Sequence, residues 1–501
     1  MTDGPRKASL GERAIAGLAW GVIGGVVGKL AGFLAQIYLG WVLSKEDFGL
    51  FALATSCAAI LSGMVNGGTQ RVLVQRGKRY DDYAWVVLQI SAIFNVVIMV
   101  ALAASAIPLA RWFEAPILAP MLVIMGVATL ISTPGHVLQA KLFTALRFDI
   151  VQGLAICSHI VRYGTTMLFA YLGMGPLSFV LPLMVIAVTD NLFVFFVVRS
   201  LPPRRRLNSE AFFDIFKDSR WVMISAFAGA LILNGDNLAI GIFADKKVLG
   251  VYFFAFQLTF AVASLIGGTF QSVLMPMLVN IADDRERQWQ GFKRAVSAAS
   301  LASSGMAMML VIAAPQLVHT IWNGKWDEAV PVVQILSLAV PALLVSWIGR
   351  ASIEARGGWS TATCLSSLEG VGTIAIASVG AVFGGLPVIA AAVALFKIIA
   401  GLTYIVVAAR KLSTNGRMAL SPVISAYAAA LGALAAGRLS VVWSNALSKH
   451  DVICSAITAL VCIIAFSILS TLFCRSGVVE LRSALEIIRR RIGGSSVGSA
   501  S

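Results

Sequence analysis

Charged residues are scarce in this sequence. Asp, Glu, Lys and Arg together make up 13% of the 501 residues, whereas hydrophobic residues make up 58%. Soluble domains carry about twice this share of charge, because their surface is solvated. The scarcity excludes an assembly of soluble domains and indicates a protein with many membrane spans.

Cysteines and histidines are also few, and neither type forms a motif. The six cysteines contain no C-x-x-C pair, which argues against a disulfide framework. The four histidines are scattered without metal-ligand spacing: His136, His159, His319 and His450. No metal site is therefore predicted.

A glycine-rich stretch, GVIGGVVGKLAGF (21–33), suggests a phosphate-binding loop at first sight. Such a loop needs a glycine where this chain has Ile23 and a hydroxyl residue where it has Leu30. The spacing excludes a nucleotide loop, and no cofactor and no catalytic residues are predicted from any other motif.

The net charge of +15 could indicate a nucleic-acid partner. The basic residues are, however, spread in short clusters between apolar runs, as the positive-inside rule requires of membrane proteins. We expect no nucleic-acid partner.

Apolar runs recur along the whole chain, and a membrane-crossing helix needs about 20 apolar residues. The predicted spans are 14–43, 47–68, 84–108, 117–138, 150–172, 175–198, 221–243, 248–274, 294–318, 329–349, 361–383, 385–408, 421–441 and 451–473. The predicted fold is an all-α polytopic membrane protein of about 14 transmembrane helices. Its connecting loops are too short to hold an extramembrane catalytic domain.

An even number of spans places both termini on one side of the membrane. Most of the 39 Lys and Arg residues lie in the tails and loops of that side. The opposite loops hold only Lys45, Arg111, Lys246, Lys247, Lys325, Arg438 and Lys449. This bias predicts that both termini are cytoplasmic.

A weak internal repeat relates residues 42–54 to residues 242–255, at an offset of 201 that aligns Gly49 with Gly250 and Phe51 with Tyr252. It predicts two six-helix lobes with the substrate path between them, plus two extra C-terminal helices. The predicted parts are an N-lobe (1–200), a cytoplasmic interfacial linker (201–220), a C-lobe (221–410), spans thirteen and fourteen (411–473) and a basic cytoplasmic tail (474–501). In the linker we expect a short helix capped by Asn208 or Ser209.

Charged side chains within spans need a cavity or a partner, so each is a functional candidate. They are Lys29, Arg162, Lys397, Asp190, Asp236 and Glu369. The alternative is that the cations and anions pair as internal ties. Asp236 belongs to NGDN (234–237), which we expect to break its helix locally.

Lys29 lies in a helix rich in glycine. Gly17, Gly21 and Gly25 form one row at helical spacing, and Gly24, Gly28 and Gly32 form a second. Such rows allow close contact with another helix or leave open space beside the lysine.

Several of these features together resemble a known family. The fourteen spans, the repeat, the segment WVLSKEDFGLFAL (41–53) and the GTQR segment (68–71) resemble the polysaccharide transporters of the multidrug/oligosaccharidyl-lipid/polysaccharide exporter superfamily. The resemblance extends to about residue 410, and over the last two spans it holds in number only.

This resemblance implies a flippase of the bacterial inner membrane. It would move an undecaprenyl-pyrophosphate-linked repeat unit from the cytoplasmic to the periplasmic leaflet by alternating access, for O-antigen or exopolysaccharide assembly. Its partners would be membrane lipid and the lipid-linked oligosaccharide, with a polysaccharide polymerase and a chain-length regulator as further candidates. No cofactor is implied.

The resemblance also implies roles for individual residues. Pyrophosphate or acidic sugars would be bound by Lys29, Arg71, Arg162 and Lys397. Sugars would be contacted, or the cavity lined, by Gln36, Asn234 and Asn237, and by the aromatic residues Trp20, Tyr38 and Tyr252. A coupling proton or sodium ion would be bound by Asp190, Asp236 or Glu369.

Two other functions stay open. A cation-coupled multidrug or toxin exporter of the same superfamily usually has twelve spans and an anionic cavity. Lys29 and Arg162 argue against it, whereas Asp190 and Asp236 favour it. A membrane-embedded polysaccharide polymerase or ligase needs a large outer loop with catalytic Arg and His residues, and the richest outer loop here is the short WNGKWDE (322–328).

Overall fold

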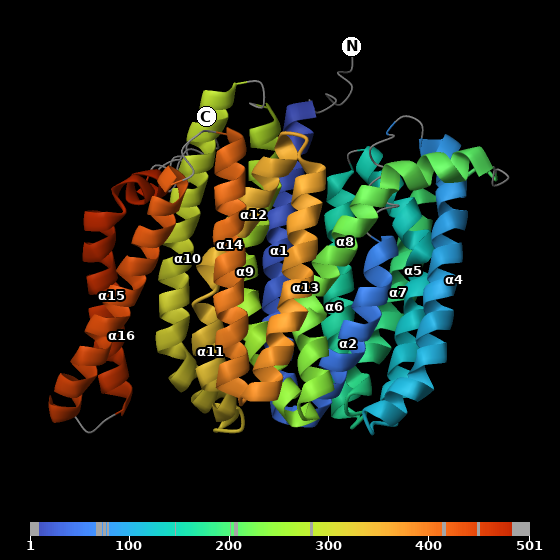
Figure 1. Cartoon of the computed structure of the whole chain (residues 1–501). Coiled ribbons are helices and arrows are strands. Elements are labelled where there is room, and N and C mark those ends of the chain that lie inside the picture. The colour runs from blue at the N-terminus through green and yellow to red at the C-terminus, as the bar shows by residue number, and fades with distance from the viewer. Residues whose placement is uncertain are drawn as a thin grey trace, which may run out of the picture. The chain divides into compact units, whose positions relative to one another are not determined.

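A computed structural model gives the architecture of the chain (Figure 1). It describes residues 10–66, 73, 77, 80–145, 147–200, 202–204, 209–280, 284–412, 417–447 and 451–482. Over these ranges the regular secondary structure is helical throughout, which confirms the predicted all-α class.

The chain divides into two compact units, which are described separately. The first comprises residues 1–253 and 366–382, and the second comprises residues 254–365 and 383–501. The first unit contains α1 (Leu10–Val42), α2 (Lys45–Asn66), α4 (Tyr80–Trp112), α5 (Leu118–Thr144), α6 (Phe148–Tyr171), α7 (Leu177–Val198), α8 (Ser209–Phe243), the start of α9 (Lys246–Asn280) and most of α13 (Trp359–Phe383). The second contains the rest of α9 and of α13, α10 (Arg285–Trp322), η2 (Asp327–Ala329), α11 (Val330–Ser337), α12 (Val340–Ala355), α14 (Leu386–Leu412), α15 (Arg417–Leu447) and α16 (Asp451–Phe473).

Within the described residues each predicted span contains helix, and the span 329–349 is divided among η2, α11 and α12; the count of fourteen membrane crossings stays a prediction. Within the described residues, ten helices are long and apolar enough to cross a membrane, and up to twelve if two bent helix pairs each count as one span. The two helices outside this set are α2, which begins with Lys45, Glu46 and Asp47, and α6, which carries many polar residues.

One prediction about α8 is wrong. The NGDN segment does not interrupt α8, which runs as one helix from Ser209 to Phe243. Two of its polar side chains make hydrogen bonds inside the helix: Asn234 Nδ2 donates to the carbonyl oxygen of Ala230 at 3.1 Å, and the Asn237 N–H also donates to Asp236 Oδ1 at 2.8 Å. These bonds form without opening the helix. The short helix expected in the linker also begins at Ser209, as the first part of α8.

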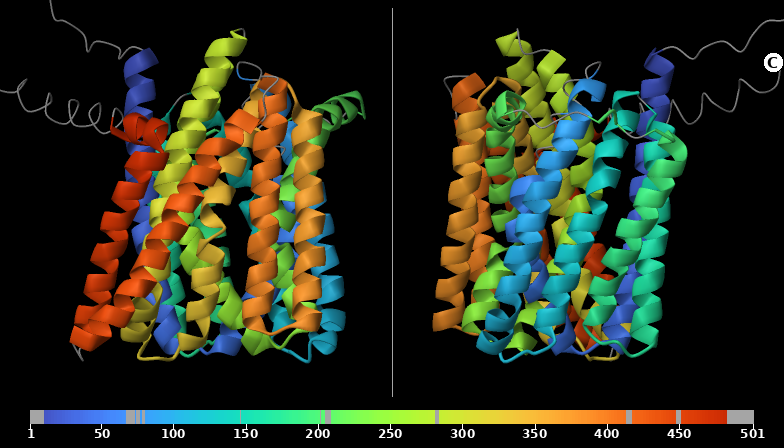
Figure 2. Two further views of the ribbon diagram at one scale, coloured as in Figure 1. Left: turned by 60° about the vertical axis from the view of Figure 1, so that its left-hand side comes forward. Right: turned by 90° about the vertical axis from the view of Figure 1, so that its right-hand side faces the viewer.

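In the first unit, α5 packs against both α4 and α7, and the pair α4 and α5 lies side by side in the right-hand view of Figure 2. Buried hydrogen bonds connect α4 to α5: the Tyr80 hydroxyl donates to Val137 O at 2.9 Å, and Asn95 Nδ2 donates to Thr133 Oγ1 at 2.8 Å. These bonds fix the register of the two helices without exposing polar groups to lipid.

Pro134 lies inside α5 and removes one backbone donor from the helix. Carbonyl groups in the preceding turn then need donors from elsewhere. Asn191 of α7 donates from Nδ2 to a carbonyl oxygen of this turn, Ile131 O, at 2.6 Å. This bond holds α7 against α5 in the turn before the proline.

In the second unit, α15 and α16 form a hairpin that also packs against α10 (Figures 1 and 2). The two helices approach closely at Gly437, where a Cβ would overlap the sulfur of Cys462. The Cys462 thiol donates to the carbonyl oxygen of Ala433 at 3.3 Å. This cysteine is therefore a packing residue.

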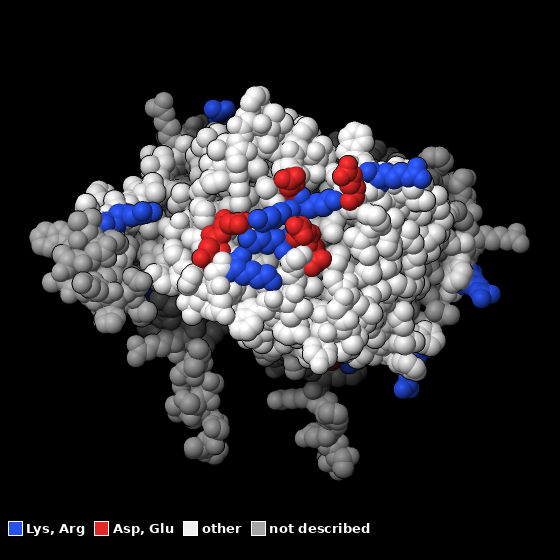
Figure 3. All heavy atoms as spheres, turned by 90° about the horizontal axis from the view of Figure 1, so that it is seen from below, with Lys and Arg blue, Asp and Glu red and all other residues white. Residues whose placement is uncertain are grey.

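Within the first unit, the beginnings of α2 and α9 cross at two glycines. A Cβ on Gly49 would overlap the carbonyl oxygen of Lys246, and a Cβ on Gly250 would overlap that of Lys45. The two contacts are equivalent at the repeat offset of 201, so each half of the repeat presents the same backbone group to the other. Figure 3 shows this end of the molecule, where basic and acidic side chains stand together. Here Lys246 Nζ donates to Glu114 O at 2.8 Å.

We expect Gly49→Ala and Gly250→Ala each to destabilise the protein, by about 1–3 kcal/mol, because an added methyl group overpacks a backbone crossing. Gly229→Ala on α8 is the control, since no atom lies within 4 Å of its added Cβ. Alanine there favours the helix by up to about 1 kcal/mol. Thermal unfolding in detergent measures both effects, and equal shifts at all three sites would contradict the tight crossing.

Candidate functional site

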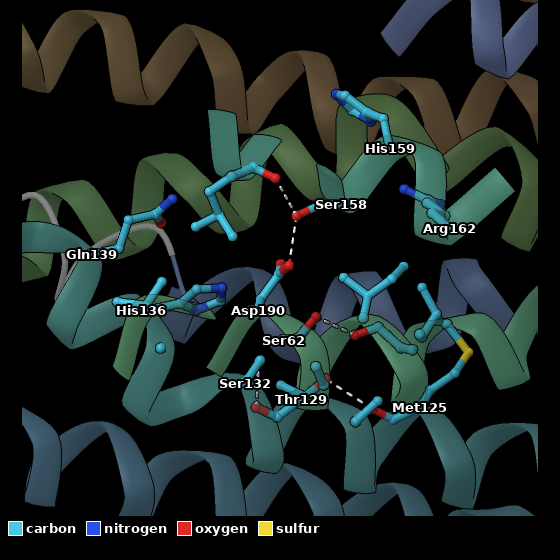
Figure 4. A pocket seen from close by; sticks show the side chains of 18 of the residues that line it. Ser62, Met125, Thr129, Ser132, His136, Gln139, Ser158, His159, Arg162 and Asp190 are labelled. Carbon is cyan, nitrogen blue, oxygen red and sulfur yellow. Dashed lines mark hydrogen bonds between the residues drawn. The ribbon is translucent and has the colours of Figure 1, made fainter. Parts of the chain in front are cut away.

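A cavity of about 480 Å³ lies within the first unit (Figure 4). Its walls come from α2, α5, α6 and α7. This volume falls in the range of small-ligand sites, roughly 300–1,000 Å³. It therefore has room for the headgroup of a ligand.

Ionisable side chains from three helices line this cavity. They are His136 of α5, His159 and Arg162 of α6, and Asp190 of α7. In Figure 4 His136 lies beside Asp190, while His159 and Arg162 lie together on α6. The cavity thus contains one carboxylate, one guanidinium group and two imidazoles, at a depth where such groups need polar surroundings.

Ser158 connects α6 to the carboxylate of Asp190. Its hydroxyl oxygen lies 2.6 Å from Asp190 Oδ1 and 2.9 Å from the carbonyl oxygen of Leu154. The hydroxyl has one proton, so it can donate to only one of these two acceptors at a time. When it donates to Leu154, Asp190 completes the short contact only by carrying a proton itself. The geometry therefore links the protonation of Asp190 to the rotation of one hydroxyl group.

The neighbouring face of α6 packs on α1. Along the second glycine row of α1, a Cβ at Gly24 would come within 2.9 Å of Gln152 Oε1, and one at Gly32 within 2.8 Å of the Tyr163 hydroxyl. Gly28 faces His159 in the same way. This row is therefore a close helix contact, one of the two alternatives open from the sequence, and it receives bulky polar residues of α6.

Of the residues predicted to bind substrate or ion, the structure brings Arg162 and Asp190 to the cavity. Lys29 and Gln36 lie on α1, Asn234, Asp236 and Asn237 on α8, and Glu369 on α13, and none of these six is among the lining residues. Lys397 lies on α14, in the second unit. Arg71 and the side chain of Trp20 lie outside the described residues. The functional roles of these residues stay predictions.

Asp236 has a different environment from Asp190. Its side chain is fully buried, and Oδ2 accepts a hydrogen bond from the Tyr252 hydroxyl at 2.8 Å. Tyr252 is fully buried too, on the first turns of α9. The bond therefore connects α8 to the start of α9, next to the turn between them.

Sequence reasoning missed most of the cavity lining. On α5 the missed residues Thr129, Ser132, His136 and Gln139 recur at steps of three and four, so they form one polar stripe along a helix. Polar residues at this spacing in an apolar span are the sequence signal that predicts a polar cavity wall. The histidines lack metal-ligand spacing in the sequence, and their spacing does not indicate that His136 and His159 face one cavity.

Comparisons with known proteins decide the family. A sequence profile described as "polysaccharide biosynthesis protein" matches residues 39–331, more than half of the chain. The chain belongs to the polysaccharide biosynthesis protein family. Its relatives include the lipopolysaccharide biosynthesis protein WzxC of Escherichia coli K12, 20% identical over 329 residues that span 66% of this chain and 67% of WzxC. The teichuronic acid biosynthesis protein TuaB of Bacillus subtilis 168 is 20% identical over 331 residues, 66% of this chain and 68% of TuaB.

Solved structures show that the fold of this family member is shared with transporters. The lipid II flippase MurJ in an inward closed conformation aligns with a TM-score of 0.69, at 13% identity, over 90% of this chain and 98% of MurJ. An inward-facing multidrug resistance MATE transporter of the MOP superfamily aligns with a TM-score of 0.62, at 14% identity, over 78% and 95%. The predicted resemblance is confirmed, and the chain is a multi-pass membrane protein of this fold.

We expect Tyr252→Phe to lower the unfolding free energy by about 1–3 kcal/mol, because the buried Asp236 carboxyl loses a hydrogen-bond donor. Thermal unfolding in detergent measures the loss. Tyr171→Phe is the matched control, since Tyr171 is 78% exposed. Equal effects of the two substitutions would show that the bond to Asp236 contributes nothing.

Proposed function

We propose that this protein flips an undecaprenyl-pyrophosphate-linked oligosaccharide from the cytoplasmic to the periplasmic leaflet of a bacterial inner membrane. Both termini would be cytoplasmic, and two lobes, 1–200 and 221–410, would alternate in their access to the two leaflets. The names of WzxC and TuaB support a polysaccharide precursor as the substrate class. The fold shared with the lipid II flippase MurJ supports a lipid-linked one.

The observation that carries this proposal is the position of Arg162 in a membrane cavity. A guanidinium group offers several N–H donors in a planar fork, which suits the oxygens of a phosphate group. His136 and His159 line the same cavity and add further possible donors. A pyrophosphate would find here the polar contacts that it loses on leaving water.

Other predicted residues would contact the substrate at other points of its path across the membrane. Arg71, Lys29 and Lys397 would attract the anionic headgroup before or after it reaches Arg162. Gln36, Asn234 and Asn237 would contact sugars. A polysaccharide polymerase and a chain-length regulator would act on the product at the periplasmic face.

Asp190 is our candidate for coupling to protons or sodium ions, in preference to Asp236 and Glu369. It borders the cavity, and the single proton of Ser158 is shared between its carboxyl group and a backbone carbonyl. Asp236 is fully buried against Tyr252, and Glu369 is 7% exposed outside the cavity lining.

We expect Arg162→Ala to slow translocation of a lipid-linked oligosaccharide in proteoliposomes by about 10- to 100-fold, the effect of losing a charge-assisted contact of about 1.5–3 kcal/mol. Arg162→Lys should retain part of the rate, because it keeps the charge but not the planar fork. Arg147→Ala, at the exposed start of the same helix, is the control, because Arg147 pairs with Asp149 at 3.1 Å outside the cavity.

Transport at the wild-type rate by Arg162→Ala, at matched protein levels, would remove the phosphate role from Arg162. Efflux of a cationic dye that stops on Asp190→Asn, together with no lipid translocation by the wild type, would instead favour the multidrug exporter.

We expect translocation by the wild type to respond to an imposed pH gradient or sodium gradient, and Asp190→Asn to lose that response. Asparagine keeps the size of the side chain but cannot exchange a proton. Asp149→Asn is the control, since Asp149 lies at the exposed start of α6. A response that persists in Asp190→Asn would rule out Asp190 as the coupling residue.

A further inference from the structure

Part of the cavity wall consists of hydroxyl side chains. α2 contributes Thr55 and Ser62, and α5 contributes Thr129 and Ser132. Figure 4 shows Ser62, Thr129 and Ser132 on the far side of Asp190 from His159 and Arg162. The cavity therefore has a group of uncharged hydroxyl side chains next to its ionisable ones, with His136 on the same stripe of α5 as Thr129 and Ser132.

The four hydroxyl groups donate their protons to their own helices. Thr55 donates to Phe51 O at 2.7 Å and Ser62 to Ala58 O at 2.7 Å. On α5, Thr129 donates to Met125 O at 2.9 Å, and Ser132 donates to Thr129 O at 2.8 Å. Each oxygen keeps its lone pairs, so this part of the wall offers mainly hydrogen-bond acceptors.

A wall of uncharged acceptors selects for a ligand with several uncharged donors. This part of the wall does not select a cation, because hydroxyl oxygens carry no net charge; the one carboxylate of the cavity, Asp190, is accompanied there by Arg162 and two histidines. The described lining residues include no Phe, Tyr or Trp, so hydrogen bonds to these oxygens, rather than stacking on a large aromatic ring, would hold the ligand. Thr129 and Ser132 are three residues apart, about 4.5 Å along a helix, which spaces their oxygens for two hydroxyl groups of one ligand.

We propose that this wall is a subsite for an uncharged hexose of the substrate, bound through its hydroxyl groups, beside the pyrophosphate at Arg162. The proposal rests on the proposed function and adds to it the part of the substrate that α2 and α5 recognise. Thr129 and Ser132 are the residues that determine it, because both lie on the same stripe of α5.

The test compares two kinds of probe and two variants. The probes are undecaprenyl pyrophosphate alone and undecaprenyl pyrophosphate that carries one hexose, with glucose, galactose and N-acetylglucosamine used in turn. The variants are Thr129→Val, which keeps the shape of the side chain, and Ser132→Ala. Thr165→Val is the control on α6, because its hydroxyl donates to Val161 O at 2.6 Å and it does not line the cavity. Dissociation constants come from native mass spectrometry of the purified full chain.

We expect the wild type to bind at least one hexosyl lipid more tightly than the bare lipid. Each variant should weaken only the hexosyl lipid, by about three- to tenfold, the value of one neutral hydrogen bond. The control should bind both probes as the wild type does.

Two outcomes would overturn the subsite: a wild type that binds no hexosyl lipid better than the bare lipid, or variants that weaken both probes equally. In either case the bare lipid still binds, and the proposed function survives. If the wild type binds none of the four lipids, the proposed function fails together with the subsite.

Discussion

The structure of the first unit depends on keeping polar side chains away from lipid hydrocarbon. An unpaired polar group costs several kcal/mol there, so it must turn toward protein or water. α6 has two polar faces, and each lies against protein or a cavity instead of lipid. Gln152 and Tyr163 lie against the glycines of α1, Ser158 and Arg162 line the cavity, and His159 borders both. The glycines of α1 and the cavity both keep polar side chains of α6 away from lipid hydrocarbon.

The same constraint separates the two carboxylates that the sequence had grouped together. Asp236 is surrounded by protein and satisfied by Tyr252 and by a backbone N–H, so it joins two helices. Asp190 has a hydroxyl group that is shared with a backbone carbonyl, and it faces a cavity. The contacts of Asp236 stabilise a single arrangement of its carboxylate. The contacts of Asp190 allow two arrangements, which differ in the acceptor that the Ser158 hydroxyl bonds.

The sequence predicted the helical class, the helix positions and two cavity residues, Arg162 and Asp190, because hydropathy and buried charge are properties of single segments. It did not predict that α6 packs between α1 and α7, or that Tyr252 is the partner of Asp236. These depend on which helices are neighbours in space. The count of fourteen spans stays a prediction for a related reason: α2 and α6 are less apolar than their neighbours, and both contribute polar residues to the cavity wall.

The crossing of α2 and α9 has the geometry of an isologous dimer interface. In such an interface residue i of one subunit contacts residue j of the other, and j contacts i. Lys45 with Gly250, and Lys246 with Gly49, satisfy this rule within one chain. A gene duplication that fused two copies of a homodimer would leave this trace at the former symmetry axis. In a homodimeric ancestor, one substitution of this glycine would place a side chain at both symmetric contacts. In the fused chain, a substitution of Gly49 or of Gly250 affects only one of them.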